Sequence, residues 1–284
     1  MTTPTFLAIG HFCNDVAPDG YIIGGSAAYS TITARNLGCC VGAVTAVGAD
    51  FDRANPLLAG IDVVYHESEE TTIFDNRYDA DGHRQQLILG VGRRLEPCDI
   101  PQEWRDVKIA YLCPIADEVD PGLVHSFEYA LVGVTPQGWM RAWDDSERVR
   151  PKRWTSAPEI LPYADVLILS DEDIAAYPDD LETYIQLTRI VVLTHGKRGA
   201  TLYENGQTYE STAYAVAEID PTGAGDVFAA AFLIRYHETS SLQEALNFAH
   251  CVASFAVEGK GTTTIPTLAE AQGRLEGVCC RNRG

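Results

Sequence analysis

Short apolar runs recur along the whole chain, and their spacing constrains the fold more than any other feature. Each run has four to six residues and is almost continuously apolar, as expected for strands covered on both faces. Helical patterns lie between and after the runs, and residues 242–257 carry the strongest apolar stripe. This alternation predicts an α/β fold with a mainly parallel sheet between helices. The predicted strands are residues 6–9, 42–47, 109–113, 131–134, 166–169 and 190–194.

Residues 71–78 and 83–89 interrupt this alternation. They are typical of two strands around Asp81 and Gly82, and an Asp-Gly pair between two such runs is a strong hairpin signal. A hairpin inserted in an α/β domain either covers a substrate as a lid or decorates a sheet edge. A chain of 284 residues without repeats or linkers favours one domain over residues 1–284.

Composition excludes several classes of protein. The formal net charge of −19 argues against nucleic acid or an anionic membrane surface as a partner. The sequence has no apolar run of membrane-spanning length and no basic, apolar signal peptide, so we expect a cytoplasmic protein. None of the eight cysteines forms a C-x-x-C pair, which favours reduced thiols over a zinc or redox site. A local phosphate site remains compatible with this charge.

Residues 220–226, Asp-Pro-Thr-Gly-Ala-Gly-Asp, precede an apolar helical run over residues 227–234. A helix start leaves backbone N–H donors free and favours negative charge. The segment can therefore hold an anion while Asp226 presents a base, as phosphoryl transfer to a hydroxyl requires. The structural alternative is a helix cap, because aspartate is favoured at helix starts and glycine-rich turns often precede them.

Other anion-binding and catalytic signatures are missing from the sequence. It contains no Walker A pattern, no G-x-G-x-x-G after a strand, no H-E-x-x-H and no G-x-S-x-G. A protein that transfers phosphoryl groups without a Walker A loop needs another anion cradle, and residues 223–226 supply one.

Several ordered motifs resemble those of the ribokinase-like (PfkB) carbohydrate kinases. Gly10 and Asp15 are similar to that family's first-strand motif, and Gly24-Gly25 before a helix is similar to its N-terminal signature. Residues 194–200 resemble its T-x-G-x-x-G segment, and residues 220–226 match its D-x-T-G-A-G-D signature at every fixed position. The resemblance spans nearly the whole chain. It implies a three-layer α/β/α fold with a small β-stranded lid formed by parts of 11–24 and 70–92.

The resemblance also implies roles for individual residues. Asp226 would be the catalytic base, with the amides of Gly223, Ala224 and Gly225 facing the transferring phosphoryl group of ATP. The acceptor hydroxyls would lie against Asp15, Gly24, Gly25, Tyr29 and Arg141, and the nucleotide against Thr194, Gly196, Gly199 and His250. Asp173 or Glu172 would support Mg²⁺ through water, and Asp220 would lie beside a monovalent cation such as K⁺.

The sequence departs from the family pattern at some of these positions. Tyr29 replaces an asparagine that usually contacts the sugar, and Ser170 and Asp173 occupy the ends of the N-x-x-E motif. Helix residue His250 stands where many members carry an asparagine near the adenine, and a plain core histidine is the alternative. The Pro136-Gln137-Gly138 stretch with Arg141 resembles plant-type myo-inositol kinases; Arg141 would bind a phosphate or a hydroxyl cluster, or remain a loop arginine.

Together these features predict an ATP- and Mg²⁺-dependent kinase of a sugar or cyclic polyol, with myo-inositol favoured. A nucleoside kinase of the same fold is the first alternative, and an aromatic pocket around Phe74 and Tyr78 would favour it. A non-catalytic nucleotide or sugar sensor is the second, although a sensor has no need of Asp226. The lid makes a lid-mediated homodimer possible, and a monomer is equally consistent.

Overall fold

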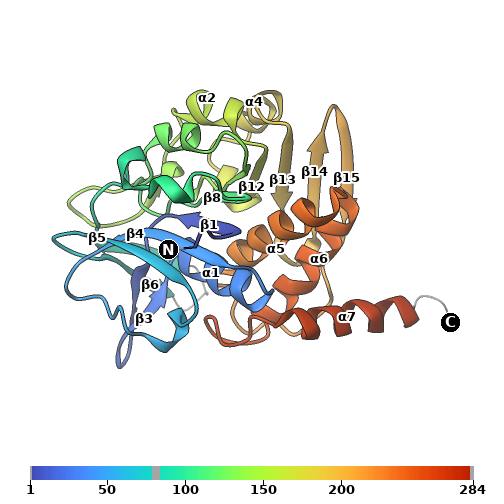
Figure 1. Ribbon diagram of the computed structural model, residues 1–284, viewed down its shortest axis with the longest axis horizontal. Coiled ribbons are helices and arrows are strands. Elements are labelled where there is room, and N and C mark those ends of the chain that lie inside the picture. Colours follow the sequence, from blue (N-terminus) through green and yellow to red (C-terminus); the bar gives the residue numbers. More distant parts are fainter. Residues whose placement is uncertain (1, 79–83, 282–284) are drawn as a thin grey trace.

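A nine-stranded sheet forms the centre of the described part of the chain, residues 2–78 and 84–281, in the computed structural model (Figure 1). Its order is β15-β14-β13-β12-β9-β8-β1-β4-β5, and all neighbours are parallel except β13–β14 and β14–β15. The strands are β1 (Phe6–Ile9), β4 (Val41–Val47), β5 (Asp62–Glu67), β8 (Ile109–Leu112), β9 (Leu131–Val134), β12 (Val166–Ser170), β13 (Ile190–Thr194), β14 (Ala200–Glu204) and β15 (Gln207–Ser211).

Apolar side chains leave this sheet on both faces, so it is buried between two layers. In β1, Phe6 and Ala8 join one core cluster, and Leu7 and Ile9 join the other. The first cluster is covered by the longer helices α1 (Ser26–Asn36), α5 (Ala224–Thr239), α6 (Leu242–Ala256) and α7 (Leu268–Arg281). The second is covered by α2 (Ala157–Ile160), α3 (Asp171–Ile174), α4 (Asp180–Leu187) and 3₁₀ turns. The predicted three-layer α/β/α fold is confirmed.

All six predicted strands are present, with ends that differ by at most one residue. The predicted hairpin also forms, as β6 (Thr72–Tyr78) and β7 (Arg84–Gly90); its turn at Asp81 and Gly82 lies outside the described residues. No helix in the described residues is both long and apolar enough to cross a membrane.

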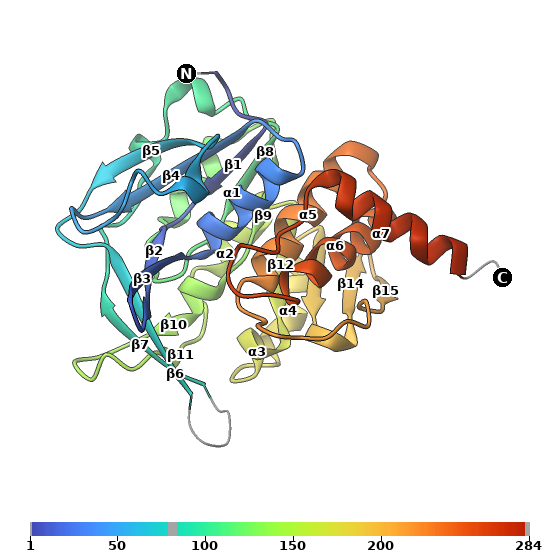
Figure 2. The same cartoon turned by 90° about the horizontal axis from the view of Figure 1, so that it is seen from below.

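A second, four-stranded sheet lies apart from the first and has the order β3-β2-β6-β7 (Figure 2). It adds β2 (Cys13–Ala17) and β3 (Gly20–Gly24) to the hairpin. These residues are the ones from which a lid is predicted. Val16, Tyr21 and Ile22 of this sheet are large exposed apolar side chains. A lid-mediated homodimer stays a prediction.

The two sheets are joined at a buried histidine, His11, which lies between β1 and β2. Its Nδ1 is 2.7 Å from Thr72 Oγ1 at the start of β6, and its Nε2 is 2.9 Å from the Arg93 carbonyl after β7. Burial lowers the pKa of His11, so the ring is neutral and offers one donor and one acceptor. The His11 amide also donates to Glu118, a buried carboxylate that accepts the Ile115 and Ala116 amides.

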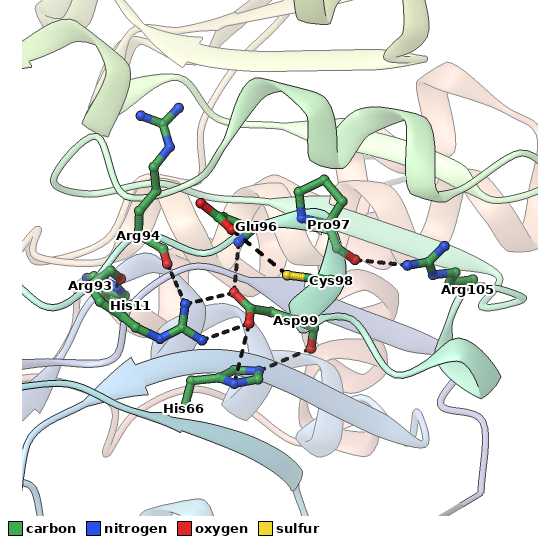
Figure 3. Close-up of polar contacts among 9 residues, drawn as sticks. All are labelled: His11, His66, Arg93, Arg94, Glu96, Pro97, Cys98, Asp99 and Arg105. Atoms are coloured by element: carbon green, nitrogen blue, oxygen red, sulfur yellow. Dashed lines mark hydrogen bonds and ion pairs between the residues drawn. The ribbon is translucent and has the colours of Figure 1, made fainter.

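The chain that returns from β7 is anchored by a polar cluster around Asp99 (Figure 3). Asp99 accepts hydrogen bonds from the guanidinium of Arg93 at 2.7 and 3.0 Å and from the Glu96 amide at 2.8 Å. His66 Nδ1 of β5 lies 3.5 Å from the same carboxylate. Burial alone would raise the pKa of Asp99, but Arg93, the Glu96 amide and His66 outweigh it and lower the pKa. The cluster therefore ties the small sheet to the edge of the large one.

Asp99→Asn should destabilise the fold because it leaves Arg93 without its carboxylate. We expect a loss of about 2–3 kcal/mol in the free energy of unfolding, less than for a fully buried pair because Arg93 is 37% exposed. The folded pKa of Asp99 is lowered, so the difference from wild type should be present at pH 7 and shrink as the pH falls below about 4. Urea unfolding measures it, with exposed Asp106→Asn as control; equal stability of Asp99→Asn and wild type at pH 7 would contradict the assignment.

Candidate active site

A cavity of about 760 Å³ lies between the small sheet and the carboxyl ends of the parallel strands. Thr135 after β9, Ser170 at the end of β12 and Thr194 at the end of β13 line one side. The inward-facing residues of β2, β6 and β7 line the other, and the start of α5 lies between them. Binding sites of open α/β sheets are expected at this edge. The inward-facing residues of the small sheet are Cys13, Asp15, Phe74, Asn76 and Gln86.

The turn before α5 has the shape that an anion site requires. Gly223 takes the left-handed conformation (φ 76°) and the helix begins at Ala224. The Ala224 amide donates to the Pro221 carbonyl at 3.1 Å and the Val227 amide to Gly223 at 3.0 Å. Within the described residues, no protein acceptor is hydrogen-bonded to the amides of Gly225 or Asp226. The Ala224 amide was expected to face the transferring phosphoryl group, but it is used inside the turn, where it donates to the Pro221 carbonyl.

Asp226 lines the cavity in the first turn of α5. Burial raises the pKa of its carboxyl to about 6, although a hydrogen bond with Ser26 and the positive charge of Arg141 act in the opposite direction. At neutral pH the group is ionised, yet it binds a proton more readily than a free aspartate does. It has the properties of a general base.

Most residues predicted at the acceptor end meet there. Asp15, Gly25, Tyr29 and Arg141 line the cavity, whereas Gly24 does not. A Cβ on Gly24 would lie 2.0 Å from Asp15 Oδ2, so this glycine leaves room for the carboxylate. The ring of Tyr29 is buried under the turn, where a Cβ on Gly223 would come within 2.2 Å of it.

At least two contacts hold Arg141 in place. Its Nη1 donates to the Ile115 carbonyl at 3.0 Å, and its guanidinium lies 5.4 Å from the ring centroid of Phe74. Phe74 itself is only 3% exposed. The side chain of Tyr78, the other aromatic residue predicted here, lies outside the described residues.

The predicted nucleotide residues Thr194, Gly196, Gly199 and His250 line the opposite end of the cavity. His250 Nε2 lies 2.8 Å from Ser211 Oγ, and burial lowers the pKa of the ring to about 4, so His250 is neutral. Further lining residues at this end carry no sequence motif and were missed. They are Tyr214, Val216, Glu218, Phe228, Ala253 and Val257.

The predicted cation-supporting carboxylates differ in the hydrogen bonds that their oxygens already accept. Glu172 and Asp173 both line the cavity. Asp173 Oδ2 accepts hydrogen bonds from the Ser170 amide at 2.8 Å and the Ser170 hydroxyl at 2.7 Å, which leaves its other oxygen for a ligand. Asp220 does not line the cavity; its carboxylate accepts the Thr222 amide at 3.0 Å within the turn. Its role beside a cation stays a prediction.

Comparison with known proteins agrees with this geometry. Residues 144–268 match the pfkB family carbohydrate kinase description. The chain is 27% identical to a cytidine kinase of Thermococcus kodakarensis over 84% of this chain and 91% of that protein. It is 28% identical to an inositol 3-kinase of Oryza sativa subsp. japonica over 80% of this chain and 61% of that protein.

Solved structures agree with the fold. A pyrophosphate-dependent myo-inositol-1 kinase converted by mutation into a myo-inositol-3 kinase superposes with a TM-score of 0.79. It covers 95% of this chain and 99% of its own, at 19% identity. The parallel sheet, the second sheet and the superposition show that the chain has the ribokinase fold, and its residues 144–268 match a pfkB family carbohydrate kinase domain.

Proposed function

We propose that this protein transfers the γ-phosphoryl group of ATP to a hydroxyl of a sugar or cyclic polyol, with a myo-inositol-like acceptor favoured. One observation carries the proposal: the unoccupied amides of Gly225 and Asp226 lie beside the raised-pKa carboxyl of Asp226 in one cavity. Amides hold negative charge and the carboxylate takes a proton. Phosphoryl transfer to an alcohol needs both in the same place.

In the proposed reaction the acceptor hydroxyl loses its proton to Asp226 while its oxygen bonds to the γ-phosphorus. The bond from that phosphorus to the β-phosphate oxygen breaks, and ADP leaves. Glu172 and the free oxygen of Asp173 suit Mg²⁺, which takes one or two carboxylates together with phosphate oxygens and would neutralise the donor's charge. The amides of Gly225 and Asp226 bind the transferring group.

The shape of the donor end supports a nucleotide over pyrophosphate. The cavity continues past Thr194 to a largely apolar wall that includes Val216, Phe228 and Val257. A pyrophosphate ion has no surface to bury against such a wall, whereas a purine base does. Neutral His250 in the same wall suits an uncharged base as well.

The lining of the acceptor end supports a polyol over a nucleoside. The side chains of Asp15, Asn76 and Gln86 face the cavity from the small sheet, and Gln86 Nε2 donates to Asn76 Oδ1 at 2.9 Å. The ring of Phe74, which could stack on a nucleobase, is covered by Arg141. A surface of carboxylate and amide groups matches a ring of hydroxyls. Because the chain is similar to a cytidine kinase, nucleosides are included among the acceptors to be tested.

ADP release with Mg²⁺-ATP against myo-inositol, ribose, fructose, fructose phosphate, adenosine and cytidine tests the proposal. We expect myo-inositol or a related cyclic polyol to give the highest kcat/KM, and pyrophosphate not to replace ATP. A preference for cytidine or adenosine would favour the nucleoside kinase. Failure of every acceptor to exceed background ATP hydrolysis would favour the sensor.

Asp226→Asn should slow transfer strongly without harming the fold. A loss of about 10²–10⁴ in kcat is expected for removal of a general base. The folded pKa of Asp226 is raised, so its charge costs stability above about pH 6, and Asp226→Asn should be more stable at pH 7 by up to about 3 kcal/mol. Asp62→Asn, at an exposed position of β5, is the control. Turnover of Asp226→Asn equal to that of wild type would remove Asp226 from its role.

The pH dependence of kcat/KM should follow the carboxyl of Asp226. Only the ionised form accepts a proton, so activity should be constant above about pH 6 and fall about tenfold per pH unit below it. Activity measured from pH 4.5 to 8, with circular dichroism to confirm that the fold persists, checks this. A flat profile across pH 6 in the folded protein would contradict the assignment.

Two glycine substitutions should separate the anion site from the fold. A Cβ on Gly225 meets no atom within 4 Å, so Gly225→Ala should keep or raise stability by about 0.5–1 kcal/mol, since alanine favours a helix. Because Gly225 lines the cavity beside the free amides, an added methyl group should crowd a bound phosphate and lower kcat at least tenfold. Gly223→Ala should instead lower both activity and Tm. Its φ of 76° is strained for alanine, and its Cβ would clash with the ring of Tyr29. Full activity in Gly225→Ala would show that phosphate binds elsewhere.

A further inference from the structure

The cavity is strongly acidic for a site that would bind a nucleotide triphosphate. Six carboxylates line it, and among its described lining residues the basic side chains are Arg141 and Lys197. A polyphosphate brought to such a surface needs local positive charge in addition to a metal ion. The lining carboxylates are Asp15, Asp171, Glu172, Asp173, Glu218 and Asp226.

Arg141 is committed to the acceptor end. It donates to the Ile115 carbonyl, lies over Phe74 and lowers the pKa of Asp226 through its charge. These contacts keep its guanidinium beside the base and the acceptor hydroxyls. The donor end therefore depends on the other cation.

Lys197 lies at the donor end, in the short 3₁₀ turn Gly196–Arg198 that follows β13. Both Gly196 and Gly199, which flank this turn, also line the cavity. Lys197 is exposed, and none of the described carboxylates lies within 4.0 Å of its ammonium group. Its charge is available to a ligand.

The backbone that carries Lys197 is held firmly. The His195 amide donates to the Gly199 carbonyl at 2.8 Å, and the Gly199 amide donates to Gly196 at 3.1 Å. Asp171, at the start of α3, forms an ion pair with Arg198 and lies 3.3 Å from His195 Nδ1. His195 and Arg198, on either side of Lys197, are thus bound to the helix that bears Glu172 and Asp173. Lys197 itself forms no ion pair with a described carboxylate.

We propose that Lys197 binds the phosphates of the donor that leave as ADP. The inference rests on the proposed function and adds to it a positioning residue at the leaving-group side. Lysine binds phosphate as a point charge, and negative charge builds up on the leaving group as the bond to the γ-phosphorus breaks. The amides at the start of α5 hold the transferring group, and Lys197 holds the part that stays behind.

Binding measurements separate this role from a merely exposed lysine. Calorimetry with ATP, ADP and adenosine should be carried out on wild type, Lys197→Ala, Lys197→Arg and Lys108→Ala. Lys108 is an exposed lysine at the amino end of β8, on the opposite edge of the sheet. We expect Lys197→Ala to raise the Kd of ATP and ADP about tenfold, or about 1.4 kcal/mol, and to leave adenosine unchanged. Lys197→Arg should restore most of the affinity, and Lys108→Ala should match wild type.

Steady-state kinetics give a second readout. Lys197→Ala should raise KM for ATP and leave KM for the acceptor unchanged, and added salt should narrow its difference from wild type. Equal ADP affinity in Lys197→Ala and wild type, or an equal loss for adenosine, would overturn the inference while the proposed function stands. A wild-type protein that binds neither ATP nor ADP would overturn both.

Discussion

Two backbone amides left open at the start of α5 are the feature on which the site depends. They stay open because Gly223 turns the chain through a left-handed conformation that a side chain would strain and that the Tyr29 ring would block. The helix behind them is fixed by the core, where Phe232 and Leu233 are fully buried. A pocket of donors that cannot relax toward other partners is preorganised for negative charge.

The same position gives Asp226 its chemistry. Placing a carboxylate in the first turn of a buried helix raises its pKa through loss of water, while Ser26 and Arg141 prevent the shift from going further. The ionised carboxylate of Asp226 therefore lowers the stability of the fold, and groups with shifted pKa values of this kind are common at functional sites. Arg141 connects the small sheet with this carboxyl, because its guanidinium lies over the ring of Phe74 and its charge lowers the pKa of Asp226.

Much of the fold could be predicted because strands buried on both faces are continuously apolar, and β1 and β8 are entirely of this kind. The strands that the apolar pattern alone does not predict lack it. At the sheet edges, β5 and β15 are partly exposed. In the small sheet, β2 carries Asn14 and Asp15, and β3 begins with exposed residues. Contacts between residues far apart in the sequence decide how these strands pair, and local residue preferences do not predict such contacts.

The sequence alone determined the α/β alternation and the glycine-rich turn before α5, and it supplied Asp226 as the proposed base, because each of these depends on neighbours along the chain. Only the tertiary structure decided how those groups are used. It shows that the Ala224 amide is spent within the turn, that one oxygen of Asp173 is taken by Ser170, and that Asp220 lies outside the cavity. It also brings Asn76 and Gln86 of the small sheet to the same cavity as Lys197. Hydrogen bonds and ion pairs between distant segments leave no periodic pattern in the sequence, so their partners are known only from the folded chain.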